Sequence, residues 1–131
     1  MFTLEQIREA HSKVRSGADF PKYASHLADL GVLEYETFVC DGRTVFYGKN
    51  GYAAATPARY PEKNAGGPTT TEQFRIRLRA HQQGKTSFET FISDCIACGV
   101  SRWKVQLEKR TCTYFDGKGE MILEENIPLP R

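Results

Sequence analysis

The most restrictive feature of this sequence is a pattern that occurs twice, about 68 residues apart. When the 131-residue chain is shifted by that distance, aromatic, glycine and turn positions of its first half fall on positions of the same kind in its second half. The aligned pairs include Phe20 with Phe88, Tyr23 with Phe91, Gly31 with Gly99, Tyr35 with Trp103, and Gly51 with Gly119. Upstream, a shift of 67 residues places Glu5–Arg8 on Glu72–Arg75. Such an internal repeat predicts that both halves form the same structural unit.

Each half predicts two helices. Pro21 suits the first turn of a helix, and Gly31 or Gly99 suits the position just after its end. Residues 74–81 alternate between apolar side chains and arginine, as in a strand, but their register with the first half and their composition favour a helix. The predicted helices cover about residues 4–15, 21–30, 74–81 and 87–98, with Thr3 and Thr71 as N-caps and Gly17 and Gly84 as stops.

Three strands follow the helices in each half. Asp-Gly and Asn-Gly between apolar runs are strong hairpin signals, and such pairs occur in the turns Asp41–Arg43, Gly48–Gly51 and Asp116–Gly119. The predicted strands cover residues 33–39, 44–48, 52–56, 101–107, 111–115 and 120–125. We therefore predict an α+β fold, in which an internally duplicated α-α-β-β-β unit packs one or more antiparallel sheets against four helices.

The length of the chain predicts a single domain over residues 1–131. The first pseudo-repeat covers residues 3–56, a linker loop covers 57–70, and the second pseudo-repeat covers 71–127. A hydrophobic content of 40% is ordinary for a globular protein. A chain of this size buries enough surface to form a core without disulfide bonds.

Charge and hydropathy restrict the expected partners. The net charge of +2 and the pI of about 8.4 fall short of the pI above about 9 that is typical of nucleic-acid-binding domains. The sequence has no apolar run long enough to span a bilayer and no signal-peptide core at its start. We therefore expect a cytoplasmic protein without membrane contact, in which cysteines stay reduced.

The stretch Cys95–Cys98 has the C-x-x-C spacing of zinc and redox sites. Under the shift, however, Cys95 falls on Leu27 and Cys98 on Leu30, at the end of the second helix of each half. Reduced cysteine packs like a small apolar residue, whereas redox chemistry favours a helix N-terminus, where the dipole lowers the thiol pKa. We interpret the pair as part of the core and expect no metal site and no cofactor; zinc binding or redox use is the alternative.

Catalytic motifs are absent from the sequence. The nucleotide-binding, hydrolase and metalloprotease signatures that short motifs reveal do not occur. If the protein is a small enzyme, the candidate side chains are Cys112, His81 and Asp116. Trp103 is expected to pack in the core, with a ligand contact as the alternative. We expect no catalysis and keep an enzyme with unrecognised chemistry as the second hypothesis.

The linker loop at residues 57–70 has no counterpart elsewhere in the pattern. Loops on a rigid scaffold carry binding residues, and Arg59 and Tyr60 offer a planar cation and an aromatic face; a plain connection is the simpler interpretation. A duplicated unit also predicts a cleft between its copies, which favours a non-catalytic module that binds a small molecule or a protein, and that forms a homodimer. The expected binding residues are Asp41, Arg43, Lys49, Tyr52, Arg59, Tyr60, His81 and Cys112.

Basic residues concentrate between positions 75 and 110, with acidic residues interspersed. They are Arg75, Arg77, Arg79, Lys85, Arg102, Lys104, Lys109 and Arg110. A solvated face is the expected interpretation, and phosphate binding by a nucleic-acid interface is the third and weakest hypothesis.

Two long stretches resemble a bacterial family of unknown function. They run from HQQGKTSFETF through ILEENIP in the second half and from SGADFPKYASH through FYGKNGY in the first. The chain is similar over nearly its whole length to the YbcV-like and YdfO-like proteins, which occur in prophages and are often labelled phage envelope proteins. The resemblance implies a small α+β protein of a bacterium or its prophage, and it supplies no catalytic residues.

Overall fold

The computed structural model describes residues 2–15, 19–63 and 68–128 of the chain. Within them the order α-α-β-β-β occurs twice. The first set is α1 (Leu4–His11), α2 (Phe20–Leu30), β1 (Glu34–Phe38), β2 (Thr44–Tyr47), the short 3-10 turn η2 (Lys49–Gly51) and β3 (Ala53–Ala55). The second is α3 (Thr71–Gln82), α4 (Phe88–Ala97), β4 (Val100–Gln106), β5 (Thr111–Asp116) and β6 (Met121–Asn126). The predicted α+β class is confirmed, and residues 74–81 are helical.

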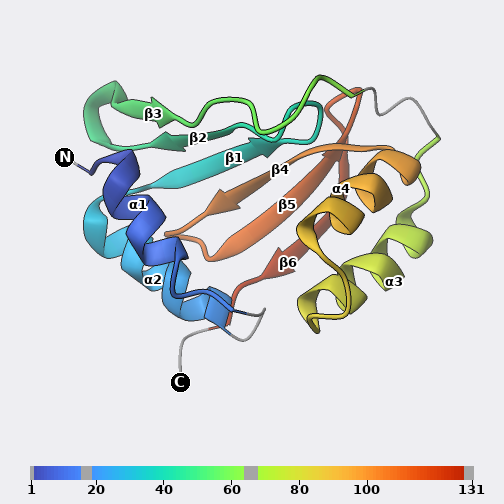
Figure 1. The fold of residues 1–131 in the computed structure, drawn as a ribbon, viewed down its shortest axis with the longest axis horizontal. Coiled ribbons are helices and arrows are strands. Elements are labelled where there is room, and N and C mark those ends of the chain that lie inside the picture. The colour runs from blue at the N-terminus through green and yellow to red at the C-terminus, as the bar shows by residue number, and fades with distance from the viewer. Residues whose placement is uncertain (1, 16–18, 64–67, 129–131) are drawn as a thin grey trace.

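The six strands form one antiparallel sheet in the order β3-β2-β1-β4-β5-β6. The two halves therefore meet at its centre, where β1 pairs with β4 (Figure 1). In this central pair Glu36 lies opposite Lys104. These two residues are 68 positions apart, which is the shift that aligns the two halves. The same position of each pseudo-repeat thus faces its counterpart, so that the sheet has an approximate twofold axis at this pair. Gene duplication as the origin of this arrangement stays a prediction.

The helices all lie on one side of the sheet, as two separate pairs. α1 packs against α2, and α3 packs against α4; Figure 1 shows the two pairs side by side in front of the strands. Tyr35 of β1 and Tyr114 of β5 point towards this side, since both belong to the buried core, whereas Glu34 and Glu36 alternate to the opposite side. One face of the sheet is therefore covered by helices and the other is not.

Helix boundaries follow the predicted capping residues with two differences. Thr3 forms a full capping box with Gln6, and Gly31 ends α2 with a φ of 103°. The cap of α3 is Thr70 rather than Thr71, which is the first helical residue. α1 ends at His11, earlier than predicted, because the Ser12 hydroxyl bonds to the carbonyl of Glu9 and the next amides form shorter turns. Gly17 lies outside the described residues.

The core contains residues from both helix pairs and both halves of the sheet. Leu27 and Cys95, which occupy the same position of the two pseudo-repeats, are both fully buried, and Cys98 is 2% exposed. In the part of the chain that the structure covers, none of the helices has the length and apolarity needed to cross a membrane.

Candidate functional site

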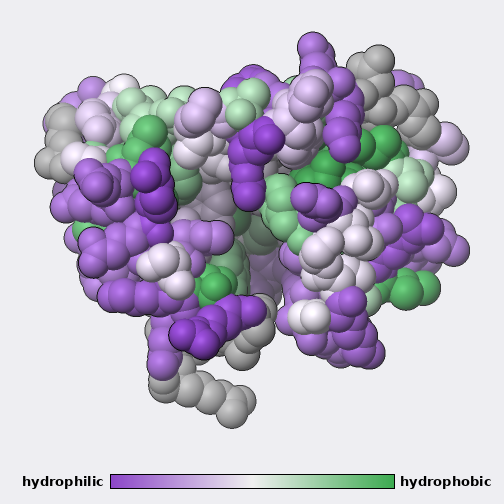
Figure 2. Space-filling view, in the orientation of Figure 1, coloured by the Kyte–Doolittle hydropathy of each residue, from purple (hydrophilic) through white to green (hydrophobic). Residues whose placement is uncertain are grey.

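The surface is hollowed between the two helix pairs, over the centre of the sheet (Figure 2). We call this hollow the groove. The two central strands run beneath it, and on their helix side Tyr35 pairs with Val105 and Thr37 pairs with Trp103; we refer to these residues as its floor. Tyr35 and Thr37 are buried, but Trp103 stays partly exposed. The helix layer therefore does not close over the tryptophan.

Each wall of the groove carries a histidine ring against an aromatic ring. On the first wall, His11 of α1 lies edge-on to Tyr23 of α2, with 5.4 Å between ring centres. On the second wall, His81 of α3 stacks on Phe91 of α4 at 4.3 Å, and Phe91 in turn contacts Trp103 at 5.6 Å. Tyr23 and Phe91 are counterparts under the 68-residue shift, so the two walls are built in the same way.

Both histidines favour the neutral form. Packing against Tyr23 partly desolvates the imidazole of His11 and lowers its pKa, and the positive charge of Arg59 lowers it further. Burial also lowers the pKa of His81, whose Nδ1 lies 3.1 Å from the Thr86 hydroxyl. Tyr23 and Phe91 are themselves buried in the core, so at neutral pH the walls present the edges of neutral imidazole rings backed by aromatic residues.

Arg59 lies across one end of the groove. Its guanidinium carbon is 4.2 Å from the centre of the Phe88 ring, at the start of α4. The positive charge of Arg59 also lowers the pKa of His11 at the end of α1, so the cation acts on residues of both helix pairs. A guanidinium over an aromatic ring keeps its outer N–H donors available for a ligand.

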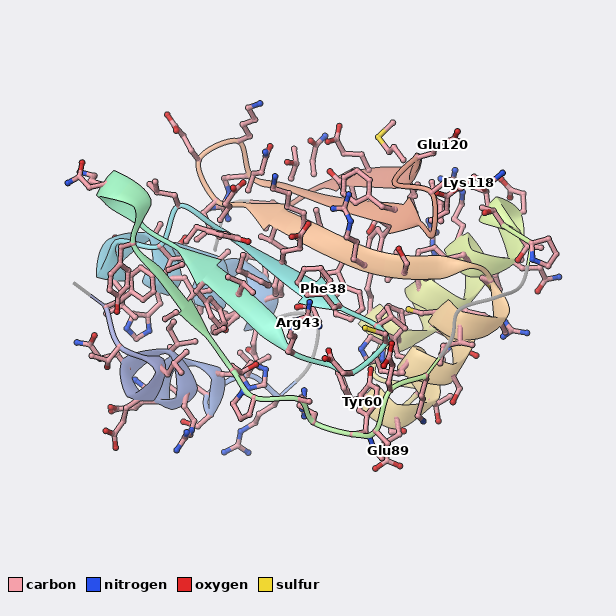
Figure 3. The ribbon with its side chains drawn as sticks, turned by 90° about the horizontal axis from the view of Figure 1, so that it is seen from above. Phe38, Arg43, Tyr60, Glu89, Lys118 and Glu120 are labelled. Atoms are coloured by element: carbon pink, nitrogen blue, oxygen red, sulfur yellow. The ribbon has the colours of Figure 1, made fainter. Side chains whose placement is uncertain are left out.

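The loop that carries Arg59 is fastened to the turn between β1 and β2. The amide of Arg59 donates to the Asp41 carbonyl at 2.8 Å, and the Tyr60 hydroxyl donates to the Val39 carbonyl. A Cβ atom at Gly42 would come within 2.7 Å of the Tyr60 ring, so the ring lies directly on the glycine. Figure 3 shows Tyr60 on this loop near Glu89 of α4. The described start of the linker loop is therefore held in a defined position.

Four of the predicted binding residues come together here. Asp41 accepts a 2.8 Å contact from Arg43, and the Arg43 guanidinium lies 4.1 Å from the Phe38 ring, as seen near the centre of Figure 3. With Arg59 and Tyr60, they form one cluster at this end of β1 and β2. The charges of Asp41 and Arg43 pair with each other. Arg59 is therefore the cation of this cluster that faces the groove.

Lys49 and Tyr52 do not join this cluster. Lys49 begins the turn at the opposite end of β2 and is exposed there, and Tyr52 follows the turn. The Tyr52 hydroxyl donates to the Phe2 carbonyl at 2.6 Å, and the two rings meet edge to face at 4.8 Å. Tyr52 therefore fastens the start of the chain to the sheet.

The candidate nucleophile Cys112 is deeply placed. It lies on β5 opposite Val105, on the helix side of the sheet, and is 8% exposed. Burial raises the pKa of its thiol to about 12, so the thiol is protonated at neutral pH and a poor nucleophile. Asp116 accepts the amides of Lys118 and Glu120, both at 2.9 Å, and thereby shapes the turn between β5 and β6.

The C-x-x-C pair is part of the core, in agreement with its predicted role. Cys95 and Cys98 are both buried, and burial raises the pKa of Cys95. No group of three or more His, Cys, Asp or Glu side chains within residues 2–15, 19–63 and 68–128 is arranged to hold a metal ion.

Most of the basic residues predicted as a possible phosphate-binding face already have partners. Arg102 pairs with Glu36 at 2.5 Å and Lys104 with Glu34 at 3.4 Å, on the uncovered face of the sheet. Arg77 pairs with Asp94 of α4 at 3.0 Å. Arg75 contacts Glu72, and Arg110 donates to the carbonyls of Ile127 and Pro128 and to the Ser25 hydroxyl.

Sequence reasoning missed the wall residues His11, Tyr23, Phe88 and Phe91, which it treated as helix or core positions. One signal could have found them. Tyr23 aligns with Phe91 and Tyr35 with Trp103, and in the structure these equivalent residues occupy corresponding positions in the two halves. A repeated aromatic position in the second helix and first strand of each half therefore indicates which helices and strands pack together.

Comparison with known proteins gives a family without a described activity. The profile of the family described as "Protein of unknown function (DUF1398)" matches residues 8–126. Uncharacterized protein Rv2012 of Mycobacterium tuberculosis is 55% identical over 47 residues, which cover 36% of this chain and 29% of that protein. Uncharacterized protein Mb2035 of Mycobacterium bovis matches to the same extent. The match thus spans less than a third of the length of these relatives.

Proposed function

This chain belongs to the family described as a protein of unknown function (DUF1398), and we propose that it is a non-catalytic binding module. In this proposal, the ligand lies in the groove between the two helix pairs. It is a small molecule, or a short segment of another protein, with a flat apolar body and an anionic group.

The observation that carries this proposal is the partial exposure of Trp103 at the centre of the helix-covered side. Its counterpart Tyr35 is only 7% exposed, so the tryptophan is the position that the helix layer leaves accessible. Concave sites lined by aromatic rings with a few polar groups are typical ligand sites. A flat apolar group that covers the indole would remove this surface from water.

Arg59 and His11 favour an anionic group at the same end of the groove. The ion pairs of the described residues do not include Arg59, and its charge is close enough to lower the pKa of His11. A carboxylate or phosphate bound here would accept hydrogen bonds from the guanidinium. It would also raise the pKa of His11, because an opposite charge favours the protonated ring.

Catalysis is less well supported by the same geometry. The raised pKa of Cys112 keeps its thiol protonated, and Asp116 accepts the amides that form its own turn.

The cytoplasmic location, the origin in a bacterium or its prophage, and association into a homodimer stay predictions from the sequence. Similar proteins are often labelled phage envelope proteins, and the proposed binding at the groove does not depend on that label.

A fragment library screened by thermal shift tests the proposal. Trp103 is the single tryptophan of the chain, so its fluorescence reports each hit independently. We expect aromatic carboxylates among the hits, and we expect Arg59→Ala to weaken them about tenfold, since a charged hydrogen bond contributes roughly 1.5–3 kcal/mol. Arg8→Ala, an exposed arginine of α1, is the matched control. Hits that leave the tryptophan fluorescence unchanged, or that bind Arg59→Ala and wild type equally well, would contradict the placement.

A further inference from the structure

A second surface, separate from the groove and independent of its ligand, lies on α3. It is a hollow of about 490 Å³ lined by Arg75, Ile76, Arg79, Ala80, Gln83 and Lys85. We propose that this hollow is a docking site for an acidic segment of a partner protein that inserts one large apolar side chain. We call it the α3 hollow.

Ile76 is the apolar centre of the α3 hollow. α3 buries Phe74 and Leu78 in the core, whereas the Ile76 side chain is 66% exposed and is one of three large hydrophobic residues exposed in the described part of the chain. Over α3, Figure 2 shows a small hydrophobic patch surrounded by hydrophilic side chains. A single exposed apolar residue is common on protein surfaces, so it is the combination of Ile76 with the hollow and its charged rim that indicates a contact site.

Positive charge surrounds this apolar centre. Arg75 and Arg79 are one helical turn apart and therefore lie on the same side of α3, and Lys85 follows the end of the helix. Arg75 makes one exposed contact, 3.6 Å to Glu72. Arg79 and Lys85 are not among the ion pairs of the described residues. The rim of the α3 hollow is therefore cationic, and no acidic side chain lines it.

Charge complementarity selects an acidic partner with an apolar residue. Carboxylates at the rim would pair with the arginines and the lysine, and an apolar side chain between them would cover Ile76. A nucleic-acid backbone satisfies the first condition but leaves the isoleucine facing phosphates. The low net charge of +2 and the pairing of the other basic residues also argue against an extended phosphate contact.

The corresponding surface of the first half lacks these features. Under the shift of 67 residues, Ile76 corresponds to Glu9 and Arg79 corresponds to Ser12. Glu9 in α1 and Ser12 just after it are exposed, but neither is apolar or positively charged. Arg75 and Ala80 correspond to the basic residues Arg8 and Lys13, so this surface shares some positive charge but has no apolar centre. The combination of an apolar centre with a cationic rim therefore occurs in the second half alone, and α1 supplies a control surface that has charge without the isoleucine.

Selection from a random peptide library, with the full-length protein as the target, tests this proposal without knowledge of the partner. The variant Arg79→Glu with Lys85→Glu reverses the rim charge, and Ile76→Ser removes the apolar centre. The control is Arg8→Glu with Lys22→Glu, which reverses two exposed charges of α1 and α2. Circular dichroism establishes that each variant is folded, and fluorescence anisotropy measures the affinity of the selected peptides.

We expect enriched peptides that combine Asp or Glu with Leu, Ile, Phe or Trp. Their dissociation constants should rise at least about tenfold with the reversed rim and severalfold with Ile76→Ser, because several exposed charge contacts and one apolar contact together contribute on the order of a factor of ten. The control should not change them. The proposal is wrong if no acidic consensus emerges or if the reversed rim binds as well as wild type. It is also wrong if oligonucleotides displace the peptides while Ile76→Ser has no effect, since the surface would then bind anions by charge alone.

Discussion

The guanidinium carbon of Arg59 lies 4.2 Å from the centre of the Phe88 ring, and this contact joins the linker loop to the second helix pair. The loop begins after β3 of the first half, so the contact carries it across the boundary between the halves. Its position depends on the turn beneath it, where Tyr60 rests against Gly42. Changes at this turn should therefore affect both the stability of the fold and the groove.

Gly42→Ala is expected to loosen the loop. Gly42 has a φ of 76°, and an added Cβ would lie 2.7 Å from the Tyr60 ring and 3.2 Å from the Arg59 Cβ. The left-handed conformation alone costs a non-glycine residue roughly 1–2 kcal/mol, and displacement of the tyrosine adds about 1 kcal/mol or more. Urea denaturation should show a loss of about 2–3 kcal/mol in the free energy of unfolding.

Gly119→Ala is the matched control for that substitution. Its φ of 84° imposes the same backbone strain, but an added Cβ would meet nothing within 4 Å. We expect a loss of only roughly 1–2 kcal/mol and no change at the groove. Equal losses for the two variants would show that Tyr60 does not press on the turn.

Tyr60→Phe removes the hydroxyl that donates to the Val39 carbonyl. The ring stays in place against Gly42, so the variant isolates the hydrogen bond. We expect a loss of about 1 kcal/mol in unfolding free energy, as is usual for one hydrogen bond to a neutral acceptor. Hydrogen exchange should also become faster at the amides of Arg59 and Lys63, which bond to the same turn. If hydrogen exchange at these two amides were unchanged, the Tyr60 hydroxyl would not be what anchors the loop to the turn.

The four cysteines should differ in reactivity towards a thiol reagent such as Ellman's. Cys95, Cys98 and Cys112 are buried, and Cys40 is half-buried. Burial raises the pKa of Cys95, and that of Cys112 to about 12, which reduces the thiolate fraction. In the native protein we expect Cys40 to react first and the other three only as the protein unfolds. Rapid reaction of Cys95 and Cys98 would contradict their assignment to the core.

Stability should fall as the pH is lowered from about 7 to 5. The folded protein lowers the pKa of both His11 and His81 below the ordinary value of 6.5. The unfolded chain therefore binds protons at a higher pH than the folded chain, and the free energy of unfolding decreases until the folded-state pKa values are passed. Calorimetry across this range should show a falling Tm, with a shallower fall for His81→Gln. A Tm that is independent of pH in this window would mean that the walls do not desolvate the rings.

Local features of the fold were predictable because they depend on neighbours in sequence. The capping box at Thr3, the left-handed end of α2 at Gly31 and the hairpin turns each involve a few consecutive residues. The repeat extended this information, since it predicted that Cys95 packs like Leu27 and that residues 74–81 are helical. The end of α1 was harder to predict, because the Ser12 hydroxyl donates to the Glu9 carbonyl and the helix ends before its apolar pattern stops.

The groove could be predicted only as a cleft between the copies. Its geometry depends on contacts between distant parts of the chain, such as the bond from Tyr60 to Val39 and the pairing of β1 with β4. Neither follows from local composition. The exposure of Trp103 could not be predicted for the same reason. The sequence indicates a buried strand residue, whereas the exposure results from the space between the two helix pairs.

The most direct measurement of the groove as a binding site is a nuclear magnetic resonance titration with a hit of the fragment screen. Trp103 is the single tryptophan, so one indole N–H signal reports the floor of the groove without ambiguity. We predict that this signal shifts together with the amides around Arg59 and His11. An indole signal that stays in place while amides on the uncovered face of the sheet shift, around Glu36 and Lys104, would show that the ligand binds elsewhere and that the groove is not the site.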